Sequence, residues 1–325
     1  MRNRVRYLIK HTLDELYELG KGVKRGQLQR EMKKLTNKRE SHFLHTSTTK
    51  VRYERAMMTF CDYLEDEWGI KRESHLKRTS TEQLQQIVDN YFKELADEGY
   101  SKGTIKIHIA AMEKSLAVIR PDIRDYLMND ANRIGWWSAG QESKKGDSYV
   151  DPDAIREQLD ETHRMIAEAQ ALCGFRVREI ARAEVNREEH TITIHNAKGG
   201  RTREIYFEHR KEDFEKLADL IEKLQEQHYE KTLKDYYEDI KLACEETGQE
   251  YHASHAFRYE YAQQRIEELR NNKEELRDLL DKYNADKETK ECVNDENTID
   301  KAADYVLTQE LGHNRLSMSR YYYRR

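Results

Sequence analysis

Proline is almost absent from this chain: only Pro121 and Pro152 occur among its 325 residues. Because proline interrupts helices, and because Glu, Lys, Arg, Leu and Gln are abundant, the composition favours a helical protein. The four cysteines are scattered, without the paired spacing that marks a disulfide framework or a zinc site. We therefore expect reduced thiols, as in a cytosolic protein, and no structural metal.

Long apolar runs are also missing. No segment reaches the length that spans a membrane, and the N-terminal stretch MRNRVRYLIK has no signal-peptide core. We expect no membrane partner and a location in the bacterial cytoplasm. Hydrophobic residues make up 37% of the chain, which is low but sufficient for small cores, and the length suits two or three domains.

Charge is unevenly distributed along the chain. The net charge of −5 argues mildly against a nucleic-acid partner, but residues 1–60 hold 15 Lys and Arg against 6 Asp and Glu. Residues 261–310 hold 8 against 14. This asymmetry is typical of a protein that binds a polyanion on a basic face and keeps an acidic segment away from that face. An ordinary solvated helix surface explains the same charges equally well.

Helical periodicity dominates the chain up to residue 139. Val5, Ile9 and Leu13 share one face of a predicted helix, which the GKG at 20–22 ends. Capping residues at 46–49 and at Ser80 mark the beginnings of two more helices. We interpret residues 1–45 as a basic helical N-terminal extension and 46–139 as a helical domain. The predicted helices cover 4–19, about 26–38, 46–68, 80–98, 102–119 and 122–139.

A linker and a mixed region follow. Residues 140–150 are small and polar without periodicity, which is typical of a linker. Thr191 to Ile194 and Arg203 to Phe207 alternate as strands around a turn at Lys198–Gly200, and predict a hairpin or a three-stranded sheet. The charged segment 271–300 suits part helix and part mobile insertion. The fold class is thus mainly α with a small β-sheet (α+β). Further helices are predicted at 151–172, 210–228, 232–246, 255–285, 301–311 and 315–323.

Four short stretches of the second half carry residues suited to one chemistry. They are CGFRVREI (173–180), NAKGGRTREI (196–205), HAFRYEYA (255–262) and LGHNRLSMSRYYY (311–323). The histidine and arginine of the third stretch lie one helical turn apart and can address the same anion. A tyrosine lies nine residues beyond the histidine of the fourth stretch. In chain order the candidate residues are Arg176, Lys198, His255, Arg258, His313 and Tyr322.

These residue types match the needs of attack on a DNA phosphodiester. Its nonbridging oxygens gain charge in the transition state, and arginine forks such as Arg176 and Arg258 bind two oxygens at once. A tyrosine hydroxyl, with an ordinary pKa near ~10, becomes a nucleophile when cations stabilise its phenolate and a histidine takes its proton. Lys198, on a flexible turn, would protonate the leaving 5′-oxygen. The scheme needs no metal or other cofactor.

This pattern resembles the tyrosine recombinase, or phage integrase, family. The family's G-[LF]-R-x-x-E-[LI] helix is similar to Gly174–Ile180, and its lysine-bearing β-hairpin turn is similar to Ala197–Arg203. Its H-x-x-R helix resembles His255–Arg258, its L-G-H resembles Leu311–His313, and its nucleophile corresponds to Tyr322. Each motif alone is weak, but their common order and surrounding secondary structure are specific.

The resemblance implies a tyrosine recombinase catalytic-type domain over 151–325, with a charged insertion at about 270–300. It implies that 46–139 is the family's helical (SAM-like) core-binding domain, and that the two domains clamp double-stranded DNA. It also implies self-association on DNA as a dimer or tetramer. The candidate DNA contacts are Lys102, Thr104, Lys106 and Lys114 in the first domain and Arg201 and Arg203 in the second.

Each candidate residue also has an ordinary structural explanation. Arg176 suits a helix cap or a pair with its neighbour Glu179, and Lys198 suits a solvated turn. The two histidines suit a core position and a helix end, and Tyr322 suits a frayed terminus. The lysines of 102–114 suit a solvated helix face equally well. The joint pattern favours the family's fold and DNA contact over these explanations, without proving turnover.

Two features depart from the family's pattern. His313 lies 55 residues after Arg258, well beyond the family's usual spacing, so 270–300 resembles an insertion whose acidic residues we expect on the outer face. Only three residues follow Tyr322, where many family members carry a further helix that docks on the neighbouring subunit. We therefore expect phosphate chemistry to be retained but ordered strand exchange to be impaired.

Three functions remain as hypotheses, and whether the protein is an enzyme stays open between them. The favoured one is a sequence-specific double-stranded DNA-binding protein of a prophage or mobile element, a repressor-like regulator that has lost productive strand exchange. The alternative is an active site-specific recombinase or integrase that forms a 3′-phosphotyrosyl intermediate through Tyr322. The third is a helical scaffold for protein partners, without a role on DNA.

Overall fold

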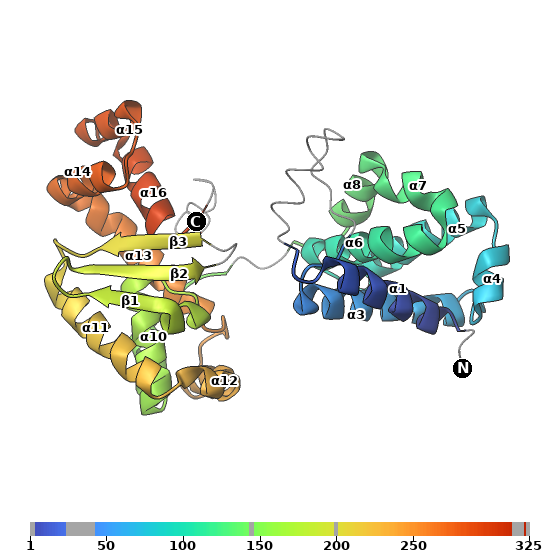
Figure 1. The fold of residues 1–325 in the computed structure, drawn as a ribbon, viewed down its shortest axis with the longest axis horizontal. Coiled ribbons are helices and arrows are strands. Elements are labelled where there is room, and N and C mark those ends of the chain that lie inside the picture. The colour runs from blue at the N-terminus through green and yellow to red at the C-terminus, as the bar shows by residue number, and fades with distance from the viewer. Residues whose placement is uncertain (1–3, 24–42, 143–145, 198–200, 314–321, 323–325) are drawn as a thin grey trace. The chain divides into compact units, whose positions relative to one another are not determined.

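The computed structural model describes residues 4–23, 43–142, 146–197, 201–313 and 322. The chain divides into two compact units, Met1–Lys144 (unit 1) and Lys145–Arg325 (unit 2), and Figure 1 labels most of their elements. The division falls within residues 140–150. The predicted fold class is confirmed, because helices make up most of the described chain and the sheet is small, antiparallel and three-stranded.

Unit 1 is a set of helices around one apolar core. Helix α1 packs against α3 and α6, and its Val5, Ile9 and Leu13 join the core that holds Phe60 and Leu64 of α3. The first helix therefore belongs to the body of this unit. The predicted helix at about 26–38 lies outside the described residues. The elements are α1 (Val5–Gly20), α3 (Ser47–Asp66), α4 (Glu73–Arg78), α5 (Thr81–Asp97), α6 (Lys102–Ile119), the 3-10 helix η1 (Pro121–Ile123), α7 (Arg124–Met128) and α8 (Asp130–Ser138).

Hydroxyl side chains begin three of these helices. Thr46, Ser80 and Ser101 each accept a hydrogen bond from the backbone N–H three residues further on. Each bond satisfies a donor that the first helical turn leaves without a partner. The predicted beginnings at 46 and at Ser80 are confirmed. The third cap fixes the first turn of α6, where two of the predicted DNA contacts lie.

Unit 2 contains the sheet, in the order β1-β2-β3, with both pairs antiparallel. Ile192 and Ile194 of β2 lie with Ile205 of β3 in a core that also holds Phe175. Residues two apart along a strand face the same side, so the TITI sequence brings these isoleucines together. Ile192 lies opposite Ile205 in the register, and a bulge follows Ile194 toward the β2–β3 turn.

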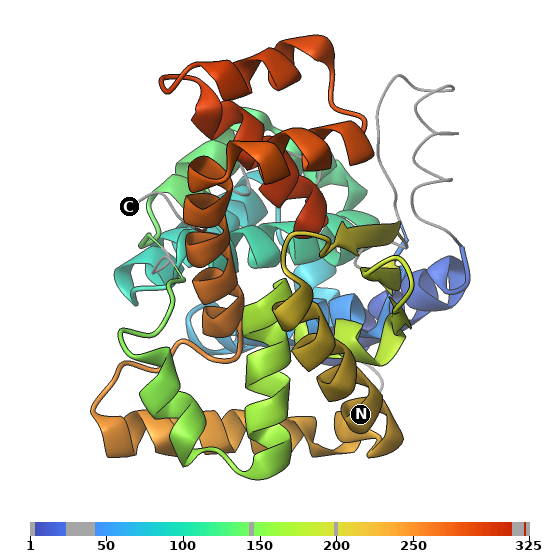
Figure 2. The ribbon, with the colours of Figure 1, turned by 90° about the vertical axis from the view of Figure 1, so that its left-hand side faces the viewer.

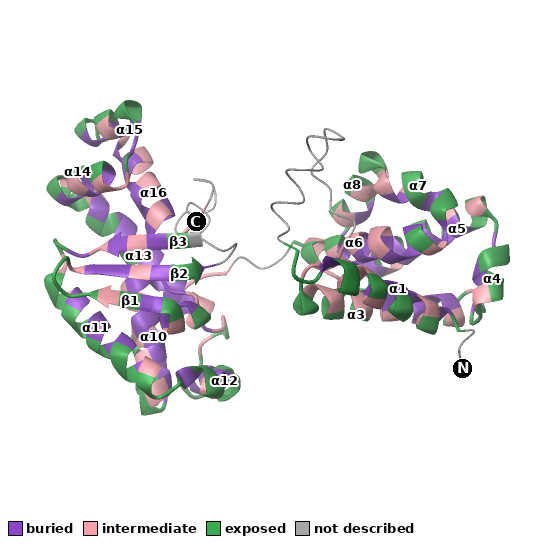
Figure 3. Ribbon diagram, viewed as in Figure 1, coloured by how far each residue is buried: buried purple, intermediate pink, exposed green. Residues whose placement is uncertain are grey.

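Helices cover this sheet and each other. Helix α10 lies beside α11 and α13, α11 lies beside β1, and α16 lies beside β3 (Figures 1 and 2). Buried residues gather on α10, α13 and the sheet, whereas α11 turns an exposed face outward (Figure 3). The elements are α9 (Pro152–Gln158), α10 (Glu161–Cys173), η2 (Val177–Arg182), β1 (Ala183–Asn186), β2 (Thr191–Ala197), β3 (Arg201–Tyr206), α11 (Lys211–Glu226), η3 (Tyr229–Thr232), α12 (Leu233–Thr247), α13 (His255–Asn271), α14 (Lys273–Lys282), α15 (Lys287–Glu291), η4 (Cys292–Asn294) and α16 (Ile299–Glu310).

Two predicted helices are each divided in two. The predicted helix 151–172 is α9 followed by α10, and the Asp160 side chain caps α10 by accepting a backbone N–H at 2.7 Å. The predicted helix 255–285 is α13 followed by α14, and the Asn272 side chain caps α14 in the same way at 3.1 Å. The short side chains of Asp and Asn compete with helical backbone bonds. They begin new helices at positions that apolar periodicity alone does not mark.

The charged segment 271–300 forms helices with an apolar core of their own. Leu276 and Leu280 of α14 and Val293 of η4 pack with Leu307 of α16. The prediction was part helix and part mobile insertion, and the structure shows the helices α14, α15 and η4 packed together. The segment's charged residues lie at exposed or half-buried positions, except Glu275, which is buried.

A buried ion-pair network joins α13, α14 and α16. Arg265 of α13 donates to Glu275 of α14 at 2.7 Å and to Glu310 of α16 at 3.1 Å, and all three side chains are buried. Tyr261 donates to the same Glu310 at 2.7 Å. Breaking one partner out of a buried pair is costly, so the network fixes how α16 meets α13. It thereby fixes the start of Leu311–His313, which follows directly.

Candidate functional site

Arg258 lies at the centre of the candidate site, in the first turn of α13, and is fully buried. Its guanidinium donates to the carbonyl of Gly174, at the end of α10, and to that of Leu311, at the end of α16 (2.6 Å). The side chain therefore ties three helices together. A glycine is required at 174, because φ is +62° and an added Cβ would lie 2.5 Å from the Tyr261 ring.

Two histidines and Tyr322 meet at this arginine. The Tyr322 hydroxyl lies 2.9 Å from His255 Nε2, and His313 Nε2 lies 3.2 Å from Arg258 Nη2. The Tyr322 ring centre lies 5.1 Å from the His313 ring centre and 5.7 Å from the Arg258 guanidinium carbon. Tyr322 is 7% exposed. Four of the six predicted catalytic residues are thus brought to one place.

Arg176 is held near this cluster by a carboxylate. Glu179 accepts from Arg176 Nη1 at 2.7 Å, and it accepts two hydrogen bonds from Arg203 of β3, at 3.2 and 2.8 Å. The Glu179 and Arg203 side chains are buried, whereas 25% of the Arg176 side chain is exposed. The ordinary pairing of Arg176 with Glu179 is therefore observed. In this pairing Arg176 still lies close enough to Arg258 for the two positive charges to interact.

The crowding of cations sets the protonation of the site. Burial, with the charges of Arg258, Arg176 and Arg203, lowers the pKa of His313 to about 3, so this histidine is neutral at neutral pH. A neutral imidazole can accept the hydrogen bond that Arg258 donates. Burial, with the charges of Arg176 and Arg203, lowers the pKa of Arg258 to about 10, which leaves it charged. Burial raises the pKa of Glu179, but the hydrogen bonds and charge of Arg203 outweigh it and bring the pKa to about 2.

Three predicted residues need separate comment. Lys198 lies outside the described residues, and so does the side chain of Arg201, which begins β3. Arg203 is described, and its guanidinium is buried against Glu179. Glu179 of the same chain thus binds the Arg203 guanidinium, which the sequence analysis expects to contact DNA. DNA contact by Arg203 stays a prediction.

The four predicted DNA contacts of unit 1 lie on α6. Lys102 forms an ion pair with the largely exposed Glu142. Thr104 takes part in the cap of the helix. Lys106 Nζ lies 3.7 Å from the centre of an aromatic ring of α8, and Lys114 lies two turns further along. These placements are compatible with a solvated helix face and with phosphate contact, so the DNA-binding role of the four stays a prediction.

Several residues that support the site were not among the catalytic residues predicted from the sequence. Gly174 supplies a carbonyl to Arg258, and Glu179 holds two arginines at once. Tyr259 stacks on Tyr322, with ring centres 4.4 Å apart and 29° between the ring planes. The R-x-x-E spacing is a signal for Glu179, because residues three apart on a helical turn are neighbours. No sequence pattern indicates the stack.

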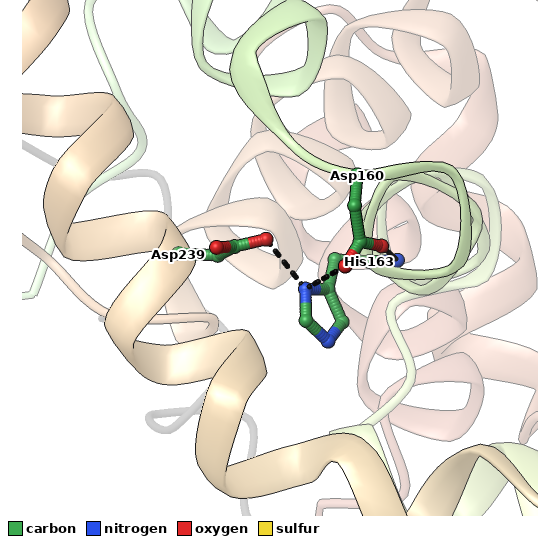
Figure 4. Close-up of side chains that lie close together, drawn as sticks. All are labelled: Asp160, His163 and Asp239. Carbon is green, nitrogen blue, oxygen red and sulfur yellow. Dashed lines mark hydrogen bonds and ion pairs between the residues drawn. The ribbon is translucent and has the colours of Figure 1, made fainter.

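Within the described part of the chain, one cluster offers ligand atoms at a spacing that suits a metal ion. The cap residue Asp160, His163 of α10 and Asp239 of α12 place them within 4.8 Å of one another (Figure 4). His163 Nδ1 faces both carboxylates, at 2.9 Å from Asp160 and 2.6 Å from Asp239. A hydrogen bond between the imidazole and Asp239, with the Asp160 carboxylate beside the same nitrogen, accounts for this arrangement. These residues take no part in the site around Arg258.

Comparison with known proteins gives one structural likeness. No family model and no curated protein matches this sequence. Among solved structures, the chain is similar to the XerH site-specific recombinase bound to a palindromic difH substrate in a post-cleavage complex. The likeness covers 98% of this chain and 90% of that chain, with 15% sequence identity and a TM-score of 0.47. At such low identity and score, we base the functional proposal on the site residues themselves.

One further finding concerns membranes. Of the helices in the described ranges, each is too short or too polar to cross a lipid bilayer.

Proposed function

We propose that this protein binds double-stranded DNA at specific sequences and cleaves and rejoins a strand through Tyr322, as a site-specific tyrosine recombinase does. In this proposal unit 1 is the core-binding domain and unit 2 carries the cleavage site. The observation that supports it best is the 2.9 Å contact between the Tyr322 hydroxyl and His255 Nε2, formed beside Arg258 and His313. In this arrangement the histidine can act as the base that activates the hydroxyl, and the arginine can bind and stabilise the phosphate that the hydroxyl attacks.

The proposed chemistry conserves the phosphodiester energy. Tyr322 Oη attacks the scissile phosphorus while His255 Nε2 takes its proton. The bond from phosphorus to the 5′-oxygen breaks, and this oxygen leaves as a hydroxyl after Lys198 gives it a proton. Arg176 and Arg258 stabilise the nonbridging oxygens. A 5′-hydroxyl can then attack the 3′-phosphotyrosyl link in the reverse sense, so rejoining needs no ATP.

A second candidate is a repressor-like regulator that keeps this site but not strand exchange. Arg258 favours it, because this side chain is fully buried and donates to the Gly174 and Leu311 carbonyls. Because the guanidinium is fully buried, a DNA phosphate reaches it only after the side chains that bury it move aside. In a regulator, arginines and lysines near DNA would contribute binding energy through phosphate contacts alone.

A nicked suicide substrate separates the two candidates. The specific duplex is first selected from a random library by binding to the full-length protein. A nick close to the scissile phosphate then lets the short 5′-hydroxyl fragment diffuse away, which traps the cleaved state. The recombinase predicts a covalent adduct that is lost in Tyr322→Phe, which removes only the hydroxyl. Tyr251→Phe, at a side chain that is 43% exposed, is the matched control and should keep the adduct.

The other outcomes distinguish the remaining hypotheses. Tight, salt-sensitive binding without an adduct, unaltered by Tyr322→Phe, supports the regulator and rules out strand cleavage. Failure to bind any duplex at low salt contradicts both DNA functions, because phosphate contacts are strongest there. That result would favour the helical scaffold for protein partners.

A further inference from the structure

Tyr259 packs directly against the ring of Tyr322. It follows Arg258 on α13, is 5% exposed, and stacks on Tyr322 with ring centres 4.4 Å apart. It also meets the His255 ring edge-on, at 5.6 Å. The Tyr322 hydroxyl is held by His255 while its ring lies on Tyr259. Stack and hydrogen bond together therefore set the direction of this hydroxyl.

A segment at the start of unit 2, residues 146–149, packs against Tyr259 and is called the brace. A Cβ added at Gly146 would lie 2.7 Å from the Cε2 and hydroxyl oxygen of Tyr259. That is well inside van der Waals contact, so a side chain at 146 would displace the ring. The φ of Gly146 lies outside the left-handed region. The ring, rather than backbone strain, therefore excludes a larger residue there.

Side-chain hydrogen bonds fasten the brace to α13 and to the loop before it. Ser148 Oγ donates to the Gln263 side-chain carbonyl at 2.7 Å, and Asp147 Oδ1 accepts from the Gln263 amide at 2.8 Å. Gln263 lies one helical turn beyond the stacking tyrosine. Tyr149 is buried and donates to the Ala253 carbonyl at 3.1 Å. Ala253 has a φ of +56°, a conformation that alanine rarely adopts.

We propose that Tyr259 is a positioning residue for Tyr322, and that the brace holds Tyr259 in the orientation that directs the Tyr322 hydroxyl to His255. This inference rests on the proposed function, because it assigns a role within the same site. The brace directly follows the division between the two units at residues 144 and 145.

Three variants separate the ring from its hydroxyl and from the brace. Tyr259→Phe keeps the stack, Tyr259→Leu removes it, and Gly146→Ala adds the methyl group that the ring excludes. With the selected nicked duplex, we expect Tyr259→Phe, which keeps the stacked ring, to form the adduct at a rate close to that of the unaltered protein and faster than Tyr259→Leu. The other two should form it about tenfold to a hundredfold more slowly, because small misplacements of a reacting group have effects of this size. DNA affinity should be unaltered in all three.

A double-variant cycle tests the path through the ring. In Tyr259→Leu the added methyl group of Gly146→Ala no longer meets an aromatic ring. The double variant should therefore react no more slowly than Tyr259→Leu alone, whereas independent effects would multiply. Gly135→Ala is the matched control, because nothing lies within 4 Å of its added Cβ. Multiplying rates, or a Tyr259→Phe variant as slow as Tyr259→Leu, would overturn the proposal.

A spectroscopic readout separates failure of this proposal from failure of the proposed function. With 3-fluorotyrosine at position 322 alone, the 19F resonance reports the ring environment whether or not DNA is cleaved. The stack predicts a resonance that Tyr259→Phe preserves and that Tyr259→Leu and Gly146→Ala both move. Such shifts without any adduct would refute strand cleavage and leave the positioning role standing. A resonance indifferent to Tyr259→Leu would refute the positioning role, whatever the adduct assay gives.

Discussion

Gly174 ends α10 in a left-handed conformation and gives its carbonyl to Arg258. We predict that Gly174→Ala destabilises unit 2 by about 2–5 kcal/mol in total. Alanine in this backbone conformation costs about 1–2 kcal/mol. Its Cβ would lie 2.5 Å from Tyr261 Cδ1 and 2.8 Å from Leu311 Cδ2. Relieving that overlap in a packed core costs about 1–3 kcal/mol more.

Gly248 is the matched control, because it ends α12 in the same way. Its φ is +67°, and nothing lies within 4 Å of an added Cβ. Gly248→Ala therefore carries the conformational cost alone, about 1–2 kcal/mol. The difference between the two variants isolates the close contact at Gly174.

Urea unfolding of the full chain, followed by far-ultraviolet circular dichroism, measures both losses. Trp68, Trp136 and Trp137 are the only tryptophans in the sequence and lie in unit 1, so their fluorescence follows that unit. We expect the urea midpoint of the fluorescence transition to be unaltered in both variants. The urea midpoint of the unit 2 transition should fall further in Gly174→Ala than in Gly248→Ala. Equal losses in the two variants would refute the claim that Gly174 is held tightly between α13 and the end of α16.

Three further predictions concern charge. Glu179→Gln leaves buried arginines without their carboxylate and should cost about 3–5 kcal/mol in urea unfolding, whereas Glu184→Gln, at a side chain 71% exposed, should cost little. Burial lowers the pKa of His108 from 6.5 to about 4, so the unfolded chain takes up a proton first as the pH falls. The stability of unit 1, complete above pH 6.5, should fall by about 3 kcal/mol toward pH 4, and His108→Gln should remove this loss from tryptophan-monitored unfolding. Lys102→Ala and Lys106→Ala should each weaken binding to the selected duplex and reduce its logarithmic salt slope by about 0.9 in titrations.

Local patterns were sufficient for much of the fold. Helix caps at Thr46 and Ser80 and the alternation in TITI act within a few residues, so they can be read without knowing the tertiary structure. The same is true of the order of the candidate site residues along the chain. Their meeting at Arg258 needs α10, α13 and α16 to pack together, which no local pattern specifies.

Long-range contacts account for what the sequence did not reveal. Arg203 could be recognised as a cation, but its burial against Glu179 depends on how β3 meets η2. The stack of Tyr259 on Tyr322 joins residues from α13 and from the chain beyond α16. The breaks at Asp160 and Asn272 are local, and they were missed because apolar periodicity continues across both.

The central claim is that Tyr322, among three consecutive tyrosines, is the nucleophile. Trypsin releases residues 321–324 as one peptide, YYYR. Tandem mass spectrometry of the nuclease-trimmed adduct shows which of the three carries the nucleotide phosphate. We predict a phosphate on Tyr322 alone. A phosphate on Tyr321 or Tyr323, or an adduct that survives Tyr322→Phe, would contradict this account.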